Sequence, residues 1–554
     1  MDVGEMQRKL SRWATEDHER KFTDLYSLLW NETWLRAAHR HVNSNAGRET
    51  AGIDGVTMSR FNADLDRHLG ELTMDLKARL FEPLPVARAY VPKPNGKLRP
   101  LGIPGIKDRI VQEALRMALE PIWEADFSIH SYGFRPHRST YDAIATIGNR
   151  LTGQSGQVYQ WVIEGDLTSY YDTIPHRKLM KAVKKRIADK DIRILMWKFL
   201  RAGVMEKGHL KDTPTGVPQG GIVSPLLANL YLHQLDVYME SKYLTLTKWQ
   251  RSQRRAQGKS NFLYVRYCDD FVVFCNGTKA EAQKMKQELG ELLHTMGLTL
   301  SEEKTKLTHI TEGFDFLGYR VIRSIGTHGR MVPKVLIPDK AIKRLREKLG
   351  ALLAPNTHND SVNAKIVALN RVIRGWCHYY RNTSSPAEIF GALSYFLYWK
   401  MAHWLGRKFT TSIAKVMKRF WNGKTFHTKS HRLVMPQEFT ATKLMVRRWY
   451  NPYTVKGSIK RELLFSYETL WTGYETRQGG MDIREEILLR DGPTCATCGG
   501  TFHASEVHAD HIVLRAKFKD PRQADRLDNY QILCTACHRA KTEADLKTLS
   551  RMRR

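Results

Sequence analysis

Two acidic residues stand side by side in a run of aromatic and β-branched residues, YVRYCDDFVVF at 264–274. Adjacent carboxylates repel each other, and burial makes both of them harder to ionise. A cation bound between Asp269 and Asp270 would remove this cost. Taken alone, an Asp-Asp pair is also common in ordinary solvated turns. The alternation of side chains predicts a β-hairpin whose turn places both carboxylates at one edge of a sheet.

A third acid makes a metal site the better interpretation. Asp166 ends a second predicted strand, VYQWVIEGD at 158–166. If the two strands are neighbours, Asp166 and Asp269 meet at the same sheet edge. Hard oxygen ligands suit Mg²⁺, which prefers one or two carboxylates together with substrate phosphates. Two such ions stabilise the attacking and leaving oxygens of an in-line phosphoryl transfer.

A different metal chemistry is indicated near the C-terminus by two C-x-x-C pairs, Cys495/Cys498 and Cys534/Cys537. Four thiolates at this spacing are typical of tetrahedral Zn²⁺. Zinc can contribute on the order of 10 kcal/mol to the folding of so small a module. A closed four-thiolate site leaves no position for water, so we expect this zinc to be structural.

The elements that position these residues alternate between strands and helices up to about residue 340. We expect mostly helix in 1–85, an amphipathic helix over 108–123, and further helices in 176–204 and 280–296. A Gly/Pro-rich loop at 213–221 opens another helix. A chain of 554 residues is too long for one core, which predicts three to five domains.

The net charge of +31, from 88 Lys and Arg against 57 Asp and Glu, predicts a polyanionic partner, most commonly nucleic acid. An anionic membrane is the alternative, but there is no apolar run of 18 residues to span one. The N-terminus has no apolar signal region, so we expect an intracellular protein.

Basic and aromatic residues alternate in 391–460, which contains 14 Lys and Arg and a single acid, Glu438. Two interpretations stay open: the aromatics stack on bases, or they form a core and only the charge binds nucleic acid. They are Tyr395, Phe396, Tyr398, Trp399, Trp404, Phe409, Phe420, Trp421, Trp449 and Tyr450.

Several long motifs resemble those of group II intron-encoded reverse transcriptases. After Asp166 come TGVPQGGIVSPLLANLYLHQLD (215–236), YCDD (267–270), GLTLSEEKTKL (297–307) and FDFLGYRV (314–321), in the order of motifs A to E. Upstream, AGIDGVT, PKPNGKLRPLGIPGIKDRIVQ and SYGFRPHRSTYDAI resemble the finger motifs of that family. The family more often has Ala at Cys268 and Lys at Thr168, and we expect Cys268→Ala to change polymerisation by only a few-fold.

The resemblance implies a role for each residue of the polymerase site. Asp166, Asp269 and Asp270 would hold two Mg²⁺ ions. Lys97 and Arg99 would neutralise the triphosphate of a dNTP, and Gln219 would lie where backbone approaches the nucleotide. Tyr171 would stack under the incoming sugar and exclude a 2′-hydroxyl, and an ordinary strand aromatic is its alternative. Lys304 is a candidate for assisting the leaving pyrophosphate.

The C-terminal module resembles HNH endonucleases through Asp510-His511, Asn529 and His538. The resemblance implies that His511 is the general base, that Asp510 and His538 bind one Mg²⁺-type ion, and that Asn529 orients the loop carrying His511. His503 and His508 are interpreted as bystanders. The alternative is a zinc module that only binds DNA.

The resemblance predicts a multidomain α/β protein with a right-hand polymerase fold. Fingers and palm would occupy 1–330, an all-α thumb and maturase domain 331–430, a DNA-binding region 431–478, and a zinc-stabilised ββα-metal HNH domain 479–554. RNA contacts are expected from one helix of the maturase domain: Arg371, Arg374, Trp376, His378 and Tyr379.

The implied function combines RNA-directed DNA synthesis, help with splicing of the intron RNA, and nicking of the second strand of target DNA. The nick frees a 3′-OH that primes synthesis. The expected location is the cytoplasm, at the nucleoid during integration. Rival classes are a reverse transcriptase of host defence, a maturase without enzymatic function, and a polymerase of another template or product class. Intact Asp166, Asp269 and His511 disfavour the second.

Overall fold

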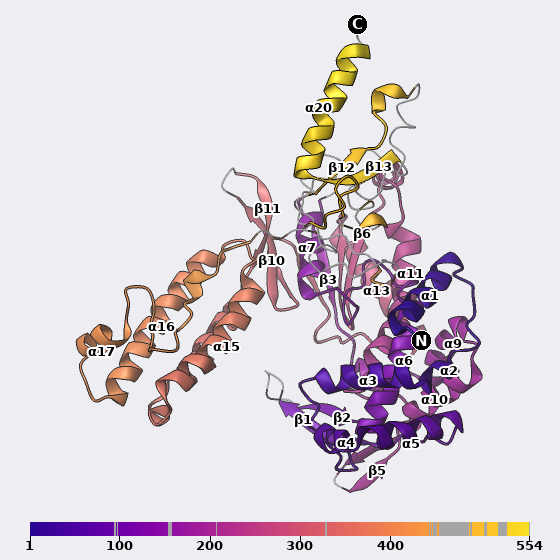
Figure 1. Ribbon diagram of the computed structural model, residues 1–554, viewed down its shortest axis with the longest axis horizontal. Coiled ribbons are helices and arrows are strands. Elements are labelled where there is room, and N and C mark those ends of the chain that lie inside the picture. The colour runs from indigo at the N-terminus through magenta and orange to yellow at the C-terminus, as the bar shows by residue number, and fades with distance from the viewer. Residues whose placement is uncertain are drawn as a thin grey trace.

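The computed structural model describes residues 1–92, 96, 98–152, 158–206, 208–326, 329–442, 444, 446, 451–453, 487, 490–492, 494–502, 507–518 and 529–552. Figure 1 shows a large body of helices and sheets, a helical arm that projects from it, and a small module that carries the C-terminus. Within these described ranges, no helix is both long enough and apolar enough to cross a membrane.

The central sheet has the strand order β6-β7-β3-β8, and each neighbouring pair is antiparallel. Strands β6 (Phe262–Tyr267) and β7 (Asp270–Cys275) form a hairpin, and β3 (Trp161–Gly165) lies between β7 and β8 (Lys306–His309). The predicted hairpin and the predicted strand before Asp166 are both confirmed.

Both faces of the central sheet are buried. Along β6, Leu263 and Val265 belong to one hydrophobic cluster and Tyr264 belongs to the other, as the period of two requires. The sequence predicted helices over one face. The structure covers the second face as well, with α7 (Thr140–Arg150) and strands of the neighbouring sheet, which explains why β7 is apolar on both sides.

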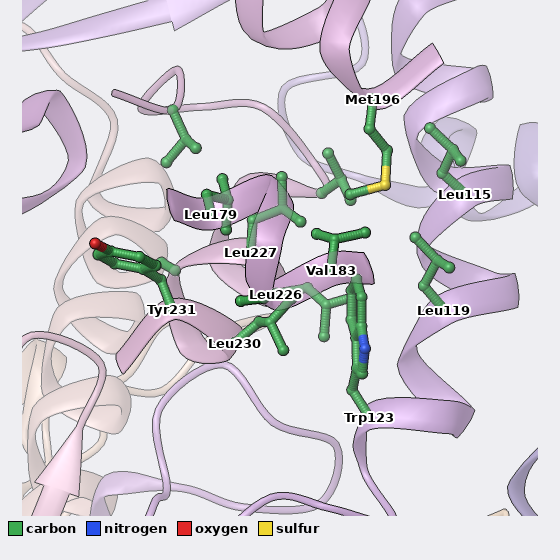
Figure 2. Packing of buried hydrophobic residues seen from close by; sticks show 14 of the residues in the cluster. Leu115, Leu119, Trp123, Leu179, Val183, Met196, Leu226, Leu227, Leu230 and Tyr231 are labelled. Atoms are coloured by element: carbon green, nitrogen blue, oxygen red, sulfur yellow. The ribbon is translucent and has the colours of Figure 1, made fainter. Parts of the chain in front are cut away.

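The first face packs against a layer of helices, most of them long. They are α6 (Ile106–Trp123), α8 (Tyr170–Thr173), α9 (His176–Arg186), α10 (Lys190–Arg201), α11 (Ser224–Met239) and α13 (Lys279–Met296). Figure 2 shows Trp123 and Leu119 of α6 facing Val183 of α9 and Met196 of α10. Helix α6 was expected to be amphipathic, but it is buried on nearly every side because N-terminal helices and α11 surround it.

The N-terminal part is helical, as predicted, and precedes a second sheet. Its helices are α1 (Val3–Glu16), α2 (Tyr26–Leu29), α3 (Glu32–Ser44), α4 (Met58–Asn62) and α5 (Leu65–Lys77). The sheet has the order β2-β1-β4-β5, with β1 (Val86–Pro92), β2 (Leu98–Ile103), β4 (Val204–Glu206) and β5 (His209–Lys211). The short helix α12 (Lys248–Ala256) precedes β6.

A three-stranded sheet joins the body to the helical arm. Its strands are β9 (Phe314–Phe316), β10 (Tyr319–Ile325) and β11 (Met331–Leu336). The arm consists of α14 (Asp339–Leu352), α15 (Val362–Tyr380), α16 (Pro386–Lys408) and α17 (Ile413–Phe420), drawn in orange tones in Figure 1. The sequence predicted that the alternation of strands and helices ends near residue 340 and that helices follow, and this is confirmed.

The C-terminal module contains the hairpin β12 (Val507–His511) and β13 (Tyr530–Cys534), followed by α20 (Thr535–Met552). Among the described residues of this module, Ile487, Val507 and Ile532 belong to one hydrophobic cluster.

Candidate active sites

Asp166, Asp269 and Asp270 come together at one edge of the central sheet. Gly165 is paired with Phe271 across β3 and β7, so Asp166 and Asp270 follow on adjacent strands. Burial and then the negative charges of Asp269 and Asp166 raise the pKa of Asp270 to about 7. This mutual repulsion is the cost that a bound cation would relieve.

The donor atoms at this edge fit magnesium. All three residues offer carboxylate oxygens, the ligands that Mg²⁺ prefers. Within the described part of the chain, only the four C-terminal cysteines have ligand atoms that all lie within 4.8 Å of one another. The carboxylate oxygens of the three aspartates do not all lie within that distance of one another.

Lys304 supplies a positive charge at the same edge. Its Nζ lies 2.8 Å from Oδ2 of Asp166 and is mostly exposed. The loop that carries Lys304 is attached to the end of β3, because the backbone N–H of Ser301 donates to the carbonyl of Asp166 at 2.8 Å. An exposed ion pair of this kind contributes little to stability, so Lys304 can leave Asp166 at small cost.

A buried ion pair supports the catalytic turn from behind, and the sequence analysis missed it. The guanidinium of Arg266 donates to both carboxylate oxygens of Asp236 on α11, at 2.7 and 2.5 Å. It also donates to Oδ1 of Asn229 at 2.9 Å and to the carbonyl of Cys268 at 3.0 Å. Burial alone would raise the pKa of Asp236, but the charge and hydrogen bonds of Arg266 hold it well below its usual range. The sequence did contain one sign of this pair, since Arg266 is a charged residue inside an otherwise apolar strand.

Two glycines allow close packing around the turn. A Cβ on Gly165 would overlap the ring of Phe271, so β3 and β7 can approach as they do only because residue 165 has no side chain. A Cβ on Gly133 would lie 2.5 Å from the backbone nitrogen of Cys268. Cys268 itself has a φ of 59°, an uncommon conformation for a residue with a side chain.

The residues predicted to contact the nucleotide include Gln219, in a loop bonded to β2, and Arg99, on β2 itself. The backbone N–H of Gly102 on β2 donates to the carbonyl of Gln219 at 2.6 Å, which attaches the 213–221 loop to the second sheet. Gly220 has a φ of 115° and lies against the carbonyl of Gly102. The sequence predicted that Gln219 needs small neighbours, and a side chain at residue 220 would indeed overlap this carbonyl. Arg99 is exposed on β2, and its charge lowers the pKa of Asp270. Lys97 lies outside the described residues.

Tyr171 lies between the loop and the catalytic turn. Its carbonyl accepts a hydrogen bond from the backbone N–H of Val217 at 2.7 Å. Its hydroxyl lies 3.3 Å from Sγ of Cys268. Burial and then the neighbouring thiol and carboxylate raise the pKa of the Tyr171 hydroxyl, which therefore stays neutral.

The predicted RNA-binding residues of α15 divide into two groups. Arg371, Arg374 and His378 are exposed along one side of the helix. Trp376 is half-buried against the rings of Tyr380 and Phe390, with centroids 4.7 and 6.0 Å away.

Tyr379 joins the arm to the β9–β10 hairpin. Its hydroxyl donates to the carbonyl of Leu317 at 2.6 Å, and its ring stacks on Tyr319 at 4.9 Å. Trp376 and Tyr379 thus have structural contacts that the sequence did not predict.

The sequence left open whether the aromatic residues of the arm form its core or lie on its surface to stack on bases. Trp404 and Phe420 are buried in the core of the arm. Tyr395 is 69% exposed and Trp399 is 39% exposed, and their rings are in contact along α16. The described aromatics therefore include both core residues and surface residues. Trp449 and Tyr450 lie outside the described residues.

The four C-terminal cysteines lie together, with their sulfur atoms within 4.8 Å of one another. Although burial raises the pKa of Cys495, hydrogen bonds from the backbone N–H groups of Cys498 and Cys534 lower it to about 6. Thiolates are the form that binds zinc. The neighbouring thiols raise the pKa of Cys537, so it is the sulfur geometry that fits a structural Zn²⁺ site, as predicted from the spacing.

Asn529 holds the loop that follows His511. Its Oδ1 accepts from the backbone N–H of Val513 at 2.9 Å, and its Nδ2 donates to the carbonyl of Val513 at 3.0 Å. The ring of His511 lies 4.2 Å from that of Tyr530. These contacts are the ones expected of a residue that orients the His511 loop.

Asp510 on β12 and His538 on α20 each take part in a contact that joins the hairpin to the helix. Asp510 forms an ion pair with Lys541 of α20 at 3.0 Å. The ring of His508 stacks on that of His538, with centroids 4.7 Å apart. His508, interpreted from the sequence as a bystander, therefore lies beside a predicted metal ligand. His503 lies outside the described residues. One carboxylate and imidazole nitrogens suit a divalent cation.

Three family models match this chain. The reverse transcriptase (RNA-dependent DNA polymerase) model matches residues 91–321. The group II intron maturase-specific domain matches 342–421, and the HNH endonuclease model matches 495–544. The three matches follow the order of the body, the arm and the C-terminal module.

Two curated relatives are similar over most of their own length. Protein YkfC of Escherichia coli K12 is 43% identical over 369 residues, covering 64% of this chain and 97% of the relative. The group II intron-encoded protein LtrA of Lactococcus lactis is 30% identical over 488 residues, covering 75% of this chain and 80% of LtrA. Among solved structures, telomerase from Candida albicans aligns with 66% of this chain and 67% of its own, at 14% identity and a TM-score of 0.34, too distant to support an argument.

Proposed function

The chain belongs to the family of group II intron-encoded proteins, and from this we propose how its separate acidic sites divide the steps of intron mobility. Its domains make it a multifunctional intron protein: an RNA-directed DNA polymerase, a maturase that assists splicing, and an endonuclease that nicks the second strand of target DNA. Target-primed reverse transcription uses the 3′-OH that the nick frees. Carrying both enzymes on one chain keeps that primer at high local concentration.

The polymerase part is arranged as fingers, palm and thumb in this proposal. Fingers and palm span 1–330, and the thumb and maturase domain spans 331–430. The central sheet serves as the palm, since it carries the three aspartates. The β1–β2 hairpin serves as a finger because Arg99 lies on it and its charge reaches Asp270.

Asp166, Asp269 and Asp270 hold the two Mg²⁺ ions of the polymerase site. When bound, these ions stabilise the attacking 3′-oxygen and the leaving pyrophosphate. Arg99 and Lys97 neutralise the triphosphate of the dNTP. Gln219 lies in the loop that borders the nucleotide.

Two further residues act on the sugar and the leaving group. Tyr171 stacks under the sugar of the incoming nucleotide. Lys304, paired weakly with Asp166, turns toward the leaving group when phosphates arrive.

The helical arm binds the intron RNA. Between residues 362 and 437 the sequence has one acid, Glu388, so the surface of the arm is strongly basic. Arg371, Arg374 and His378 provide phosphate contacts on α15. The exposed pair Tyr395 and Trp399 on α16 provides base stacking. The region 431–478, most of which lies outside the described residues, contacts the target DNA.

The nuclease chemistry belongs to the C-terminal module. Asp510 and His538 hold one Mg²⁺-type ion, which polarises the scissile phosphate when bound. His511 takes the proton of the attacking water, a role for which an imidazole is well suited. Asn529 keeps the His511 loop in place, and zinc on the four cysteines keeps the module folded. The cycle requires contact with chromosomal DNA, which places the protein in the cytoplasm and at the nucleoid during integration.

The pairing of Gly165 with Phe271 is the observation that carries this proposal, because it puts the aspartates of two distant segments at one edge. The test uses the purified protein with a transcript of the adjacent intron and a DNA target. Asp269→Ala should abolish primer extension and leave nicking, whereas His511→Ala should abolish nicking and leave extension.

Asp66→Ala and His294→Ala, changes of an exposed acid and an exposed histidine, are the matched controls and should affect neither activity. Normal nicking by His511→Ala would show that the assignment of the nuclease site is wrong.

A further inference from the structure

The tip of the Tyr171 ring has a contact that stacking under a sugar does not require. Its hydroxyl oxygen lies 3.3 Å from Sγ of Cys268, within hydrogen-bonding distance for sulfur. Cys268 belongs to the catalytic turn and immediately precedes Asp269. We propose that Cys268 is a positioning residue for sugar selection, whose thiol holds the Tyr171 ring where it excludes a 2′-hydroxyl. This inference rests on the proposed polymerase function and adds a determinant of its substrate class.

The backbone end of Tyr171 is already fixed by the 213–221 loop. The N–H of Val217 donates to the Tyr171 carbonyl at 2.7 Å. Gly216 has a φ of 90°, and a Cβ there would lie 2.8 Å from the same carbonyl. The loop therefore sets the position of the Cα atom, and the direction of the ring is left to contacts of the side chain.

The side chain has two neighbours that define this direction. The ring of Tyr170 lies edge-on at 5.8 Å, which limits rotation on one side. At the tip, Sγ of Cys268 is the hydrogen-bond partner of the hydroxyl, and it is the sole one among the residues that the structure describes. Replacing the thiol by a hydrogen atom would remove this bond and open a space into which the ring tip can move.

Cys268 is itself held firmly enough to act as an anchor. Its side chain is 3% exposed, and its backbone is in the left-handed region with a φ of 59°. Gly133 packs on its nitrogen, and the buried guanidinium of Arg266 donates to its carbonyl at 3.0 Å. A contact with so fixed a partner constrains Tyr171, whereas a contact with a mobile surface group would not.

The experiment measures kcat/KM for a dNTP and for the matching rNTP in primer extension on an RNA template. Their ratio does not depend on the fraction of active enzyme, so partial misfolding of a variant does not affect it. Cys268→Ala should lower the ratio about five-fold, the size expected for the loss of one hydrogen bond. Cys268→Ser, which keeps a group that can bond the hydroxyl, should stay within about two-fold of wild type.

Tyr171→Phe keeps the ring and removes the hydroxyl, so its ratio should fall as far as that of Cys268→Ala. The double variant should be no worse than either single variant, because both changes remove the same bond. Cys275→Ala, which changes another buried cysteine of the same sheet, is the matched control and should leave the ratio unchanged. An unchanged ratio in Cys268→Ala, or additive effects in the double variant, would overturn the proposal.

A spectroscopic readout separates this inference from the polymerase assignment. The infrared S–H band of Cys268, identified as the difference between wild type and Cys268→Ala, should shift in Tyr171→Phe. If wild type extends no primer, the polymerase assignment fails while the band still reports the hydrogen bond. An identical band in Tyr171→Phe would overturn the anchoring contact, whatever the activity.

Discussion

The ion pair between Arg266 and Asp236 gives the sharpest prediction about the support of the catalytic turn. Both side chains are fully buried, and the guanidinium makes four hydrogen bonds, one of them to the carbonyl of Cys268. Asp236→Asn keeps the shape of the side chain and removes its charge. The variant leaves a buried guanidinium without a counterion, which costs about 3–5 kcal/mol.

That cost is large enough to measure as a melting temperature. The unfolding entropy of about 2 cal/mol/K per residue makes 1 kcal/mol correspond to roughly 1.4 °C for a part of about 330 residues, so we expect its transition to fall by about 4–7 °C. Differential scanning calorimetry is the assay, because it resolves the transitions of a chain with several domains. The pKa of Asp236 is held well below its usual range, and its stabilisation is lost only when the pH falls through that low value. The deficit should therefore be the same at pH 6 and pH 8.

The control variants separate the effect of removing a buried charge from the effect of removing any acidic side chain. Asp66→Asn removes the partner of Arg36 in an exposed pair, and should change stability by less than about 1 kcal/mol. Replacing both partners, as in Asp236→Leu with Arg266→Met, should be less harmful than Asp236→Asn alone. A melting temperature for Asp236→Asn within about 2 °C of wild type would refute the reasoning.

Three further predictions concern other parts of the chain. Gly165→Ala places a methyl group against the ring of Phe271, and this overpacking should cost about 1–3 kcal/mol of stability. Because the aspartates lie next to this contact, we expect primer extension to fall at least ten-fold. Gly290→Ala, whose added methyl group has its nearest neighbour at 3.8 Å, is the control and should leave primer extension unchanged. Burial raises the pKa of Asp108 from 3.8 to about 7, so the free energy of unfolding falls as the pH rises from about 4 to about 7 and stays at its lower value above pH 7. Asp108→Asn should then raise stability by roughly 2–4 kcal/mol at pH 8 and by little at pH 4, measured by calorimetry, and a pH-independent difference would contradict this. Removal of zinc, by a zinc-selective chelator in excess Mg²⁺ or by Cys498→Ser, should unfold the C-terminal module and abolish nicking while primer extension persists. Persistence of nicking without zinc would exclude a structural role for the metal.

Much of the catalytic edge could be predicted from the sequence because its signals are local. Acids that end apolar strands were expected at the edge of a sheet, and β3 and β7 are indeed neighbours with Asp166 next to Asp270 in the register. The spacing of the four cysteines likewise predicted a cluster, and their sulfur atoms lie together. In both cases the spacing of residues along the chain indicates which side chains lie together.

The rest depends on contacts between segments that are distant in the sequence. Nothing near Arg266 indicates that Asp236 of α11 is its partner, because thirty residues and a change of element separate them. The amphipathic pattern of α6 did not predict burial on nearly every side, since other helices cover its polar residues. The division of aromatics such as Trp404 and Tyr395 between core and surface follows from the packing of α16, which composition does not determine.

The central claim is that Asp166, Asp269 and Asp270 bind the divalent ions of nucleotide transfer at one edge of the palm. The most direct measurement is anomalous diffraction from crystals of the protein with primer, RNA template, an incoming non-hydrolysable nucleotide and Mn²⁺. The account predicts Mn²⁺ peaks in contact with the carboxylates of residues 166 and 269, and their loss in Asp269→Ala. Anomalous peaks located away from these carboxylates, with the nucleotide bound, would contradict it.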